Sequence, residues 1–115
     1  MVKFGNFEVE YNRNAPDKVS VRIETDDKGE VWLPKCDIAR AYGVFVQSVN
    51  AGLKSLAKTG DFDEYRDVRV EHFTYNGKDC SVDLYSLETI IALGFRMKGL
   101  KCEAFRKWAA RRLAE

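Results

Sequence analysis

The chain has 115 residues, of which 45% are hydrophobic and 32% charged. This length suits one domain with a hydrophobic core, and the composition is typical of a soluble globular protein. No apolar run approaches the roughly 20 residues that cross a bilayer, and the first ten residues lack the apolar core of a signal peptide, so we expect a cytoplasmic protein with no membrane partner. Three cysteines (Cys36, Cys80 and Cys102) and one histidine (His72) are too scattered for a zinc motif, which predicts reduced thiols and neither a metal nor a cofactor.

Charge is unevenly distributed along the chain. The net charge of +1 is low for a protein that binds DNA by neutralising phosphates. However, residues 95–115 contain seven basic and two acidic residues, whereas residues 61–94 contain three basic and eight acidic residues. We therefore expect an electrically polarised domain that meets an anionic partner with one side only.

Apolar and polar residues alternate in the first third of the chain, which predicts strands. The apolar positions are Phe7, Val9 and Tyr11 in one run and Val19, Val21 and Ile23 in the next. A polar turn at 26–29 then leads to the apolar residues 31–33. We expect the runs on either side of this turn to form a hairpin that packs on the rest of the domain.

Two helices are predicted in the middle of the chain. Pro34 suits the first turn of a helix over 34–42, and Gly43 ends it. A second helix at about 45–58 is followed by another glycine, as helix ends often are. Residues 61–67 are expected to form an acidic loop.

A second hairpin is predicted from 68 to 84, because Asn76-Gly77 is the preferred pair for a type I′ turn. The alternation is irregular after His72, so we expect a bulge near Phe73.

Two more helices complete the chain. Ser86 can cap a helix that ends at Gly94, and its apolar stripe consists of Leu87, Ile90 and Ile91. The last helix is predicted over 100–114. The order β-β-β-α-α-β-β-α-α predicts an α+β fold: one domain over residues 1–115 with two β-hairpins, a helix-turn-helix-like pair and two C-terminal helices, similar to a winged helix.

The segment 33–56 has the residue spacing of a helix-turn-helix. Two helices that cross near a right angle need a small residue at their contact, here Ala39, and a turn residue that tolerates positive φ, here Gly43. The apolar residues expected to pack the second helix against the first are Val44, Val49 and Leu53.

In such a motif the N-terminal part of the second helix enters the major groove of DNA. The candidate base contacts are Phe45, Val46, Gln47, Asn50 and Ala51. The amides of Gln47 and Asn50 can pair with adenine, each contributing about 1–3 kcal/mol of discrimination, and Lys54 can reach a phosphate. Phe45 and Val46 are apolar, which more often indicates a core contact or a protein-binding patch, although both can touch thymine methyl groups.

The last helix has an apolar side that we expect to pack on the domain and a basic side. Its apolar residues are Cys102, Phe105, Trp108, Ala109 and Leu113. Lys107 and Arg111 lie on the opposite side, and Arg112 lies at the edge of the apolar one.

Three cations, Arg96, Lys98 and Lys101, surround Gly99 at the joint between the last two helices. A phosphate or an acidic partner is expected there, because backbone N–H groups are free at the start of a helix. The alternative is a solvated basic surface. Together with Lys54 and Lys107, these residues are the candidate phosphate contacts.

Several of these motifs resemble the N-terminal domain of the RhuM family. The matching segments are Val31-Trp32-Leu33, the helix-turn-helix-like stretch 38–49, the motif Tyr-x-Leu-x-x-Ile-Ile-x-x-Gly-aromatic-Arg at 85–96, and Phe-Arg-x-Trp-Ala at 105–109. The resemblance extends from Val19 to the end of the chain and is weaker at Phe45, Val46 and Leu100. It implies a bacterial or phage-related module, similar to the amino-terminal domains of phage antirepressors, and either a free-standing version or the N-terminal domain of a longer protein.

No catalytic constellation occurs in the sequence, which contains neither a Gly-rich phosphate loop nor a Ser-His-Asp set. We therefore predict a non-enzymatic protein that binds double-stranded DNA, as a homodimer, and regulates transcription in a phage or another mobile element. Its second hairpin would act as a wing. The alternative is an antirepressor-like module that binds a protein partner or its own copies without reading DNA.

Overall fold

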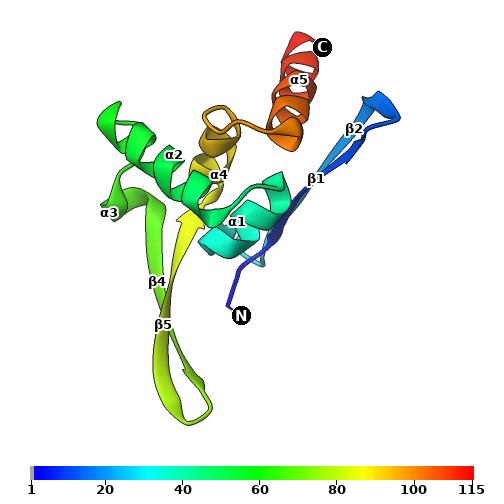
Figure 1. Ribbon diagram of the computed structural model, residues 1–115. Helices are drawn as coiled ribbons and strands as arrows, with labels where there is room; N and C mark the ends of the chain where they lie inside the picture. The colour runs from blue at the N-terminus through cyan, green and yellow to red at the C-terminus, as the bar shows by residue number, and fades with distance from the viewer. Residues whose placement is uncertain (1) are drawn as a thin grey trace.

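Two antiparallel sheets and five helices make up residues 2–115, the part of the chain that the computed structural model describes; for residues 16 and 17 it describes the backbone alone. The strands are β1 (Asn6–Asn12), β2 (Ala15–Glu24), β3 (Trp32–Leu33), β4 (Val68–Tyr75) and β5 (Lys78–Ser86). The helices are α1 (Lys35–Tyr42), α2 (Val46–Lys58), α3 (Glu64–Asp67), α4 (Leu87–Gly94) and α5 (Leu100–Ala114). The hairpins β1–β2 and β4–β5 project in different directions from a body formed mainly by α1, α2 and α4 (Figure 1). The predicted α+β class is confirmed.

The N-terminal hairpin is formed by β1 and β2, which are joined by seven residue pairs. The hairpin predicted across the turn at 26–29 is therefore wrong. Strand β3 pairs with β5 instead, through Trp32↔Ser86 and Leu33↔Tyr85. The reason is that β1 and β2 are long enough to satisfy each other's backbone hydrogen bonds, whereas β3 has only two residues and its Leu33 is completely buried in the core.

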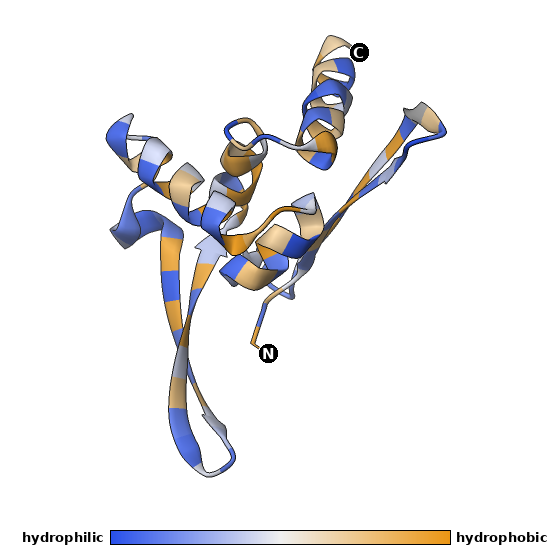
Figure 2. Cartoon of the chain, in the orientation of Figure 1, coloured by the Kyte–Doolittle hydropathy of each residue, from blue (hydrophilic) through white to orange (hydrophobic). Residues whose placement is uncertain are grey.

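The hairpin predicted at 68–84 is confirmed. Both turn residues have the positive φ of a type I′ turn, 51° at Asn76 and 75° at Gly77. Strands β4 and β5 pair in one continuous register, so the bulge predicted near Phe73 is wrong. Hydrophobic and hydrophilic residues are interspersed along this hairpin, which projects from the body (Figure 2). An irregular alternation of apolar residues therefore does not require a bulge here.

The two C-terminal helices begin and end as predicted. The Ser86 hydroxyl caps α4 by accepting a hydrogen bond from the Thr89 N–H at 3.3 Å. On α5, Cys102 and Phe105 are buried and Trp108 is half-buried against the core. The prediction that Leu113 packs on the domain is wrong, because its side chain is 85% exposed where α5 extends beyond the body.

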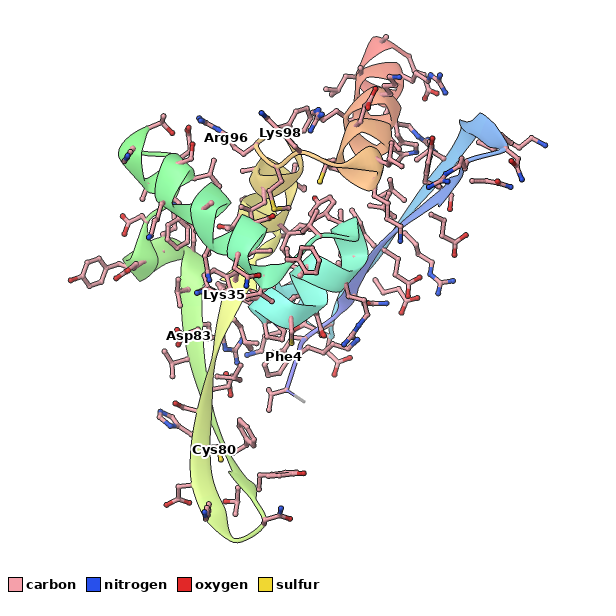
Figure 3. All side chains as sticks on the ribbon, viewed as in Figure 1. Phe4, Lys35, Cys80, Asp83, Arg96 and Lys98 are labelled. Carbon is pink, nitrogen blue, oxygen red and sulfur yellow. The ribbon has the colours of Figure 1, made fainter. Side chains whose placement is uncertain are left out.

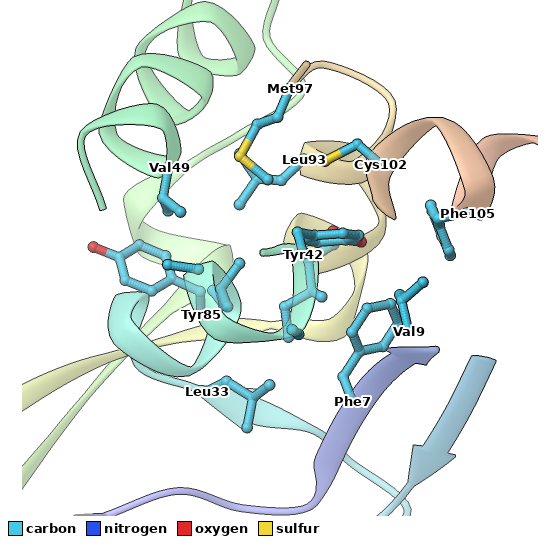
Figure 4. Close-up of a cluster of buried hydrophobic side chains, with 14 of the residues drawn as sticks. Phe7, Val9, Leu33, Tyr42, Val49, Tyr85, Leu93, Met97, Cys102 and Phe105 are labelled. Carbon is cyan, nitrogen blue, oxygen red and sulfur yellow. The ribbon is translucent and has the colours of Figure 1, made fainter. Parts of the chain in front are cut away.

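Three aromatic rings connect separate elements in the core (Figure 4). Phe7 of β1, Tyr42 of α1 and Phe105 of α5 have ring centroids 5.4 to 5.8 Å apart. The Tyr42 hydroxyl donates a hydrogen bond to the Ile90 carbonyl of α4 at 2.7 Å. Next to this cluster, Gly94 lets α4 approach so closely that a Cβ at residue 94 would lie 2.5 Å from the Phe105 ring and 2.7 Å from the Tyr42 hydroxyl oxygen.

A buried carboxylate joins α3 to the start of α4. The short helix α3 lies within the segment predicted as a loop, so that prediction is wrong at 64–67. Asp67 accepts hydrogen bonds from the Ser86 hydroxyl at 3.0 Å, from the Arg66 guanidinium at 3.0 Å and from the Asp63 N–H at 3.1 Å. Burial alone would raise the pKa of Asp67, but these hydrogen bonds outweigh it and lower the pKa below its usual value.

We expect Gly94→Ala to lower the free energy of unfolding by about 1–2 kcal/mol, because the clash outweighs the helix preference of alanine. Urea-induced unfolding measures this loss. In a chain that already carries Phe105→Leu, Gly94→Ala should cost less than it does in the wild type, since leucine is smaller than phenylalanine and relieves the clash. Losses that add within about 0.5 kcal/mol would contradict this contact.

The stabilising effect of Asp67 should depend on pH. Its folded pKa lies below the unfolded value of about 3.9, so the carboxylate stabilises the fold above that pH, and the effect is lost as the pH falls through the folded pKa. The difference in unfolding free energy between the wild type and Asp67→Asn should be constant from about pH 5 to 7 and shrink below about pH 4. Urea unfolding across this range measures it, and a difference that persists unchanged at about pH 3 would refute the linkage.

Candidate nucleic-acid interface

Helices α1 and α2 are joined by a short turn at residues 43–45. Gly43 adopts a left-handed conformation, with φ 64° and ψ 37°, and ends α1 as predicted. The Val44 N–H donates to the Ala39 carbonyl at 2.9 Å, which closes the turn. Ala39 is buried at the contact, so α2 begins close to the end of α1.

Helix α2 has one face in the core and one in solvent. Its buried residues are Val49, Gly52, Leu53 and Leu56. Gly52 makes a close backbone approach to α4, since a Cβ there would lie 2.7 Å from Leu93. The opposite face is exposed and carries Gln47, Ala51, Lys54 and Lys58. We call these four residues the outer face of α2.

The two apolar residues at the start of α2 are not core contacts. Phe45 is 81% exposed and Val46 is 38% exposed. Phe45 is also the N-cap of α2, and its side chain cannot satisfy the free N–H groups of the first turn. A large apolar side chain that neither packs nor caps adds little to the stability of the chain itself.

Asn50 lies apart from the other candidate base contacts. It lines a groove of about 700 Å³ between α2 and the β4–β5 hairpin, together with Leu53 and Tyr85, and Lys54 of the outer face lies at the same groove. Its Oδ1 atom is buried and has no hydrogen-bond partner in the described part of the chain. Gln47 is exposed on the outer face, so the structure separates the two amides that the sequence placed together.

Arg96 and Lys98 lie at the joint between α4 and α5 (Figure 3). Arg96 donates to the hydroxyls of Ser55 at 3.0 Å and Thr59 at 3.2 Å, and its guanidinium lies 3.5 Å from the Asp61 carboxylate. It therefore connects the joint to the C-terminal end of α2.

Lys98 and Lys101 do not share the surroundings of Arg96. Lys98 is exposed, whereas Lys101 is half-buried beside Gly43 and lines a hollow that also includes Glu8 and Arg40. Arg96, Lys98 and Lys101 are close in sequence but thus do not form the single anion-binding site that the sequence predicted. The last predicted phosphate contact, Lys107, lies on the exposed side of α5 and pairs with Glu103 at 3.2 Å.

Sequence reasoning missed two lysines that border α2. Lys58 follows Lys54 by one helical turn on the outer face, and this i, i+4 spacing was a usable signal. Lys35 lies 5.8 Å from the centre of the Tyr85 ring and lines the groove beside α2. No local pattern indicates Lys35, because the pairing of β3 with β5 brings α1 to this place.

Within residues 2–115, no group of three or more His, Cys, Asp or Glu side chains is placed to hold a metal ion. No helix in that range is both long and apolar enough to cross a bilayer.

Phe45→Ser should raise the free energy of unfolding by about 0.5–1 kcal/mol, because serine can cap α2 and little apolar burial is lost. Phe45→Ala is the matched control, since alanine removes the ring without adding a cap, and it should change stability by less than about 0.5 kcal/mol. Urea unfolding of both variants gives the comparison. A loss above about 1.5 kcal/mol in either variant would mean that Phe45 belongs to the core.

The chain matches no protein-family model, and no curated protein or solved structure shows significant similarity to it. Its function therefore has to be inferred from the geometry, exposure and charge of α2 and its neighbours.

Proposed function

We propose that this chain binds double-stranded DNA through the outer face of α2. The observation that carries the proposal is the combination of Gln47 with Lys54 and Lys58 on one exposed face, next to the exposed Phe45. Neither lysine has an ion-pair partner among residues 2–115, so both are available to phosphates. The protein is proposed to be non-enzymatic and cytoplasmic, and the RhuM-like motifs support a regulatory role in a phage or another mobile element.

The roles within the interface follow from the chemistry of each side chain. Gln47 can form two hydrogen bonds with an adenine edge, and Phe45 and Val46 can contact thymine methyl groups. Lys54 and Lys58, one helical turn apart, can neutralise phosphates along one side of the groove. Of the sequence-predicted phosphate contacts at the joint, Lys98 is exposed, whereas the guanidinium of Arg96, although also exposed, is hydrogen-bonded to α2.

The β4–β5 hairpin, predicted from the sequence to act as a wing, is poorly suited to contact DNA phosphates, an objection that its sequence already raises. Asp79 and Asp83 are exposed on the hairpin face that also carries Val70, and like charges there repel phosphates. In this proposal the lysines of α2 supply the electrostatic attraction to DNA, and the hairpin does not contact the DNA backbone.

The second candidate function is that of a protein-binding, antirepressor-like module. The exposure of Phe45 favours it, because exposed aromatic residues are enriched at the centres of protein interfaces. Salt dependence separates the two functions. Phosphate contacts make the logarithm of the affinity fall linearly with the logarithm of the salt concentration, and an apolar protein contact does not.

Fluorescence anisotropy with a random-sequence duplex across a salt series tests the proposal. The double variant Lys54→Glu with Lys58→Glu should reduce the salt slope by about 2 and weaken binding at least about tenfold. The matched control, Lys18→Glu with Lys28→Glu, makes the same charge change on and after β2 and should bind within about twofold of the wild type. If the wild type has no measurable affinity at about 50 mM salt, DNA binding is refuted and the protein-binding function takes its place.

A further inference from the structure

Strand β4 has one edge that no strand of residues 2–115 pairs with, since the sheet order is β3-β5-β4. Residue pairs in an antiparallel ladder alternate between pairs that exchange backbone hydrogen bonds and pairs that do not. The pair Tyr75↔Lys78, which closes the two-residue turn of this hairpin, is a hydrogen-bonded pair. The backbone groups that point outward at the free edge therefore belong to Val68, Val70, His72 and Thr74.

This edge lacks most of the features that prevent unwanted strand pairing. Strand β4 is eight residues long, contains neither proline nor glycine, and pairs with β5 without a bulge. Its two charges, Arg69 and Glu71, pair with each other at 2.6 Å, and Val70 between them is 51% exposed. The β1–β2 pairing, in contrast, has a register irregularity at Tyr11 and Asn12.

We propose that β4 pairs with β4 of a second copy of this chain, antiparallel about a two-fold axis at Val70. This register sets Val70 opposite itself and sets Arg69 opposite Glu71 of the second copy, twice by symmetry. Opposite charges on directly facing residues stabilise such a pair, and the symmetry closes the assembly as a dimer.

Charge selects this register among its neighbours. An axis at Arg69 or at Glu71 would set two like charges opposite each other, which is destabilising. An axis at His72 would set Arg69 opposite Tyr75 and Glu71 opposite Phe73, so that neither charge gains an opposite charge across the axis. Of these four registers, only the axis at Val70 sets opposite charges on directly facing residues.

Two exposed aromatic residues gain partners in the same register. The tip of each hairpin comes to lie next to α3 of the other copy, which brings Tyr75 towards Tyr65 of the second copy. Tyr65 is 99% exposed and Tyr75 is 65% exposed in the single chain. The dimer goes beyond the proposed DNA binding and does not depend on it, because its contacts come from β4 and α3, whereas the proposed DNA contacts come from α2.

Sedimentation equilibrium of the full chain without DNA tests the pairing. The wild type should be a dimer that dissociates on dilution, and Val70→Lys should be monomeric because two ammonium groups would meet at the axis. Ile23→Lys, which replaces an exposed apolar residue on β2, is the matched control and should dimerise like the wild type. Thermal unfolding checks that both variants are folded. A wild type that remains monomeric up to about 1 mM, or a folded Val70→Lys that still dimerises, overturns the proposal.

Charge reversal tests the register itself. Arg69→Glu and Glu71→Arg should each weaken the dimer about tenfold or more, because each creates two like-charged pairs across the axis. The double reversal restores both pairs and should return the dimer constant to near the wild-type value. If the single reversals leave the dimer unchanged, or the double reversal does not rescue it, the axis at Val70 is wrong. A chain that dimerises without binding DNA would refute the proposed function and leave this inference intact.

Discussion

Tyr42 is the residue on which the arrangement of the helices depends. Its ring contacts Phe7 of β1 and Phe105 of α5, and its hydroxyl donates to the Ile90 carbonyl of α4. Burial raises the pKa of Tyr42, so the hydroxyl stays protonated and remains a donor. Because Tyr42 is the last residue of α1, these contacts also fix the turn at Gly43 and the position where α2 begins. The core contacts of Tyr42 thus determine where the candidate interface on α2 lies.

Features determined by neighbouring residues could be predicted from the sequence. The left-handed glycine at Gly43, the Asn76-Gly77 turn and the Ser86 cap each follow from the chemistry of one or two residues. The ends of α5 were also predicted correctly, because Gly99 precedes a continuous helical pattern.

Features that depend on contacts distant in sequence could not be predicted in the same way. Strand β3 pairs with β5 across more than 50 residues, although β2 is its nearer neighbour in the chain. Leu113 has the right spacing for the apolar side of α5, but no element extends far enough to cover it. For the candidate site, helical spacing predicted which residues lie near the start of α2. It did not predict that Asn50 turns into the groove beside the hairpin.

The basic residues of the C-terminal region illustrate why net charge is a poor guide to function. Arg106 donates to the carbonyls of Gly94 and Met97 at 3.0 and 2.9 Å, so it satisfies backbone groups after α4. Arg112 lies over the Trp108 ring at 5.3 Å. These cations stabilise the fold, as Arg96 does at the end of α2. Cations without such partners, including Lys54 and Lys58, remain free to attract an anion.

The start of α2 adds an electrostatic argument to the exposed lysines. Side chains cap α3 and α4, through Asp63 and Ser86, whereas α1, α2 and α5 have no side-chain hydrogen bond at their N-caps; the N-cap of α2 is Phe45. The first N–H groups of α2 are therefore open, and the helix dipole adds a partial positive charge at the same end. A serine or aspartate at residue 45 would satisfy those donors from within the chain. In the proposed complexes, phenylalanine would leave those donors to a phosphate and would present its own ring to a base or a protein, so one residue that weakens the helix would serve either mode of recognition.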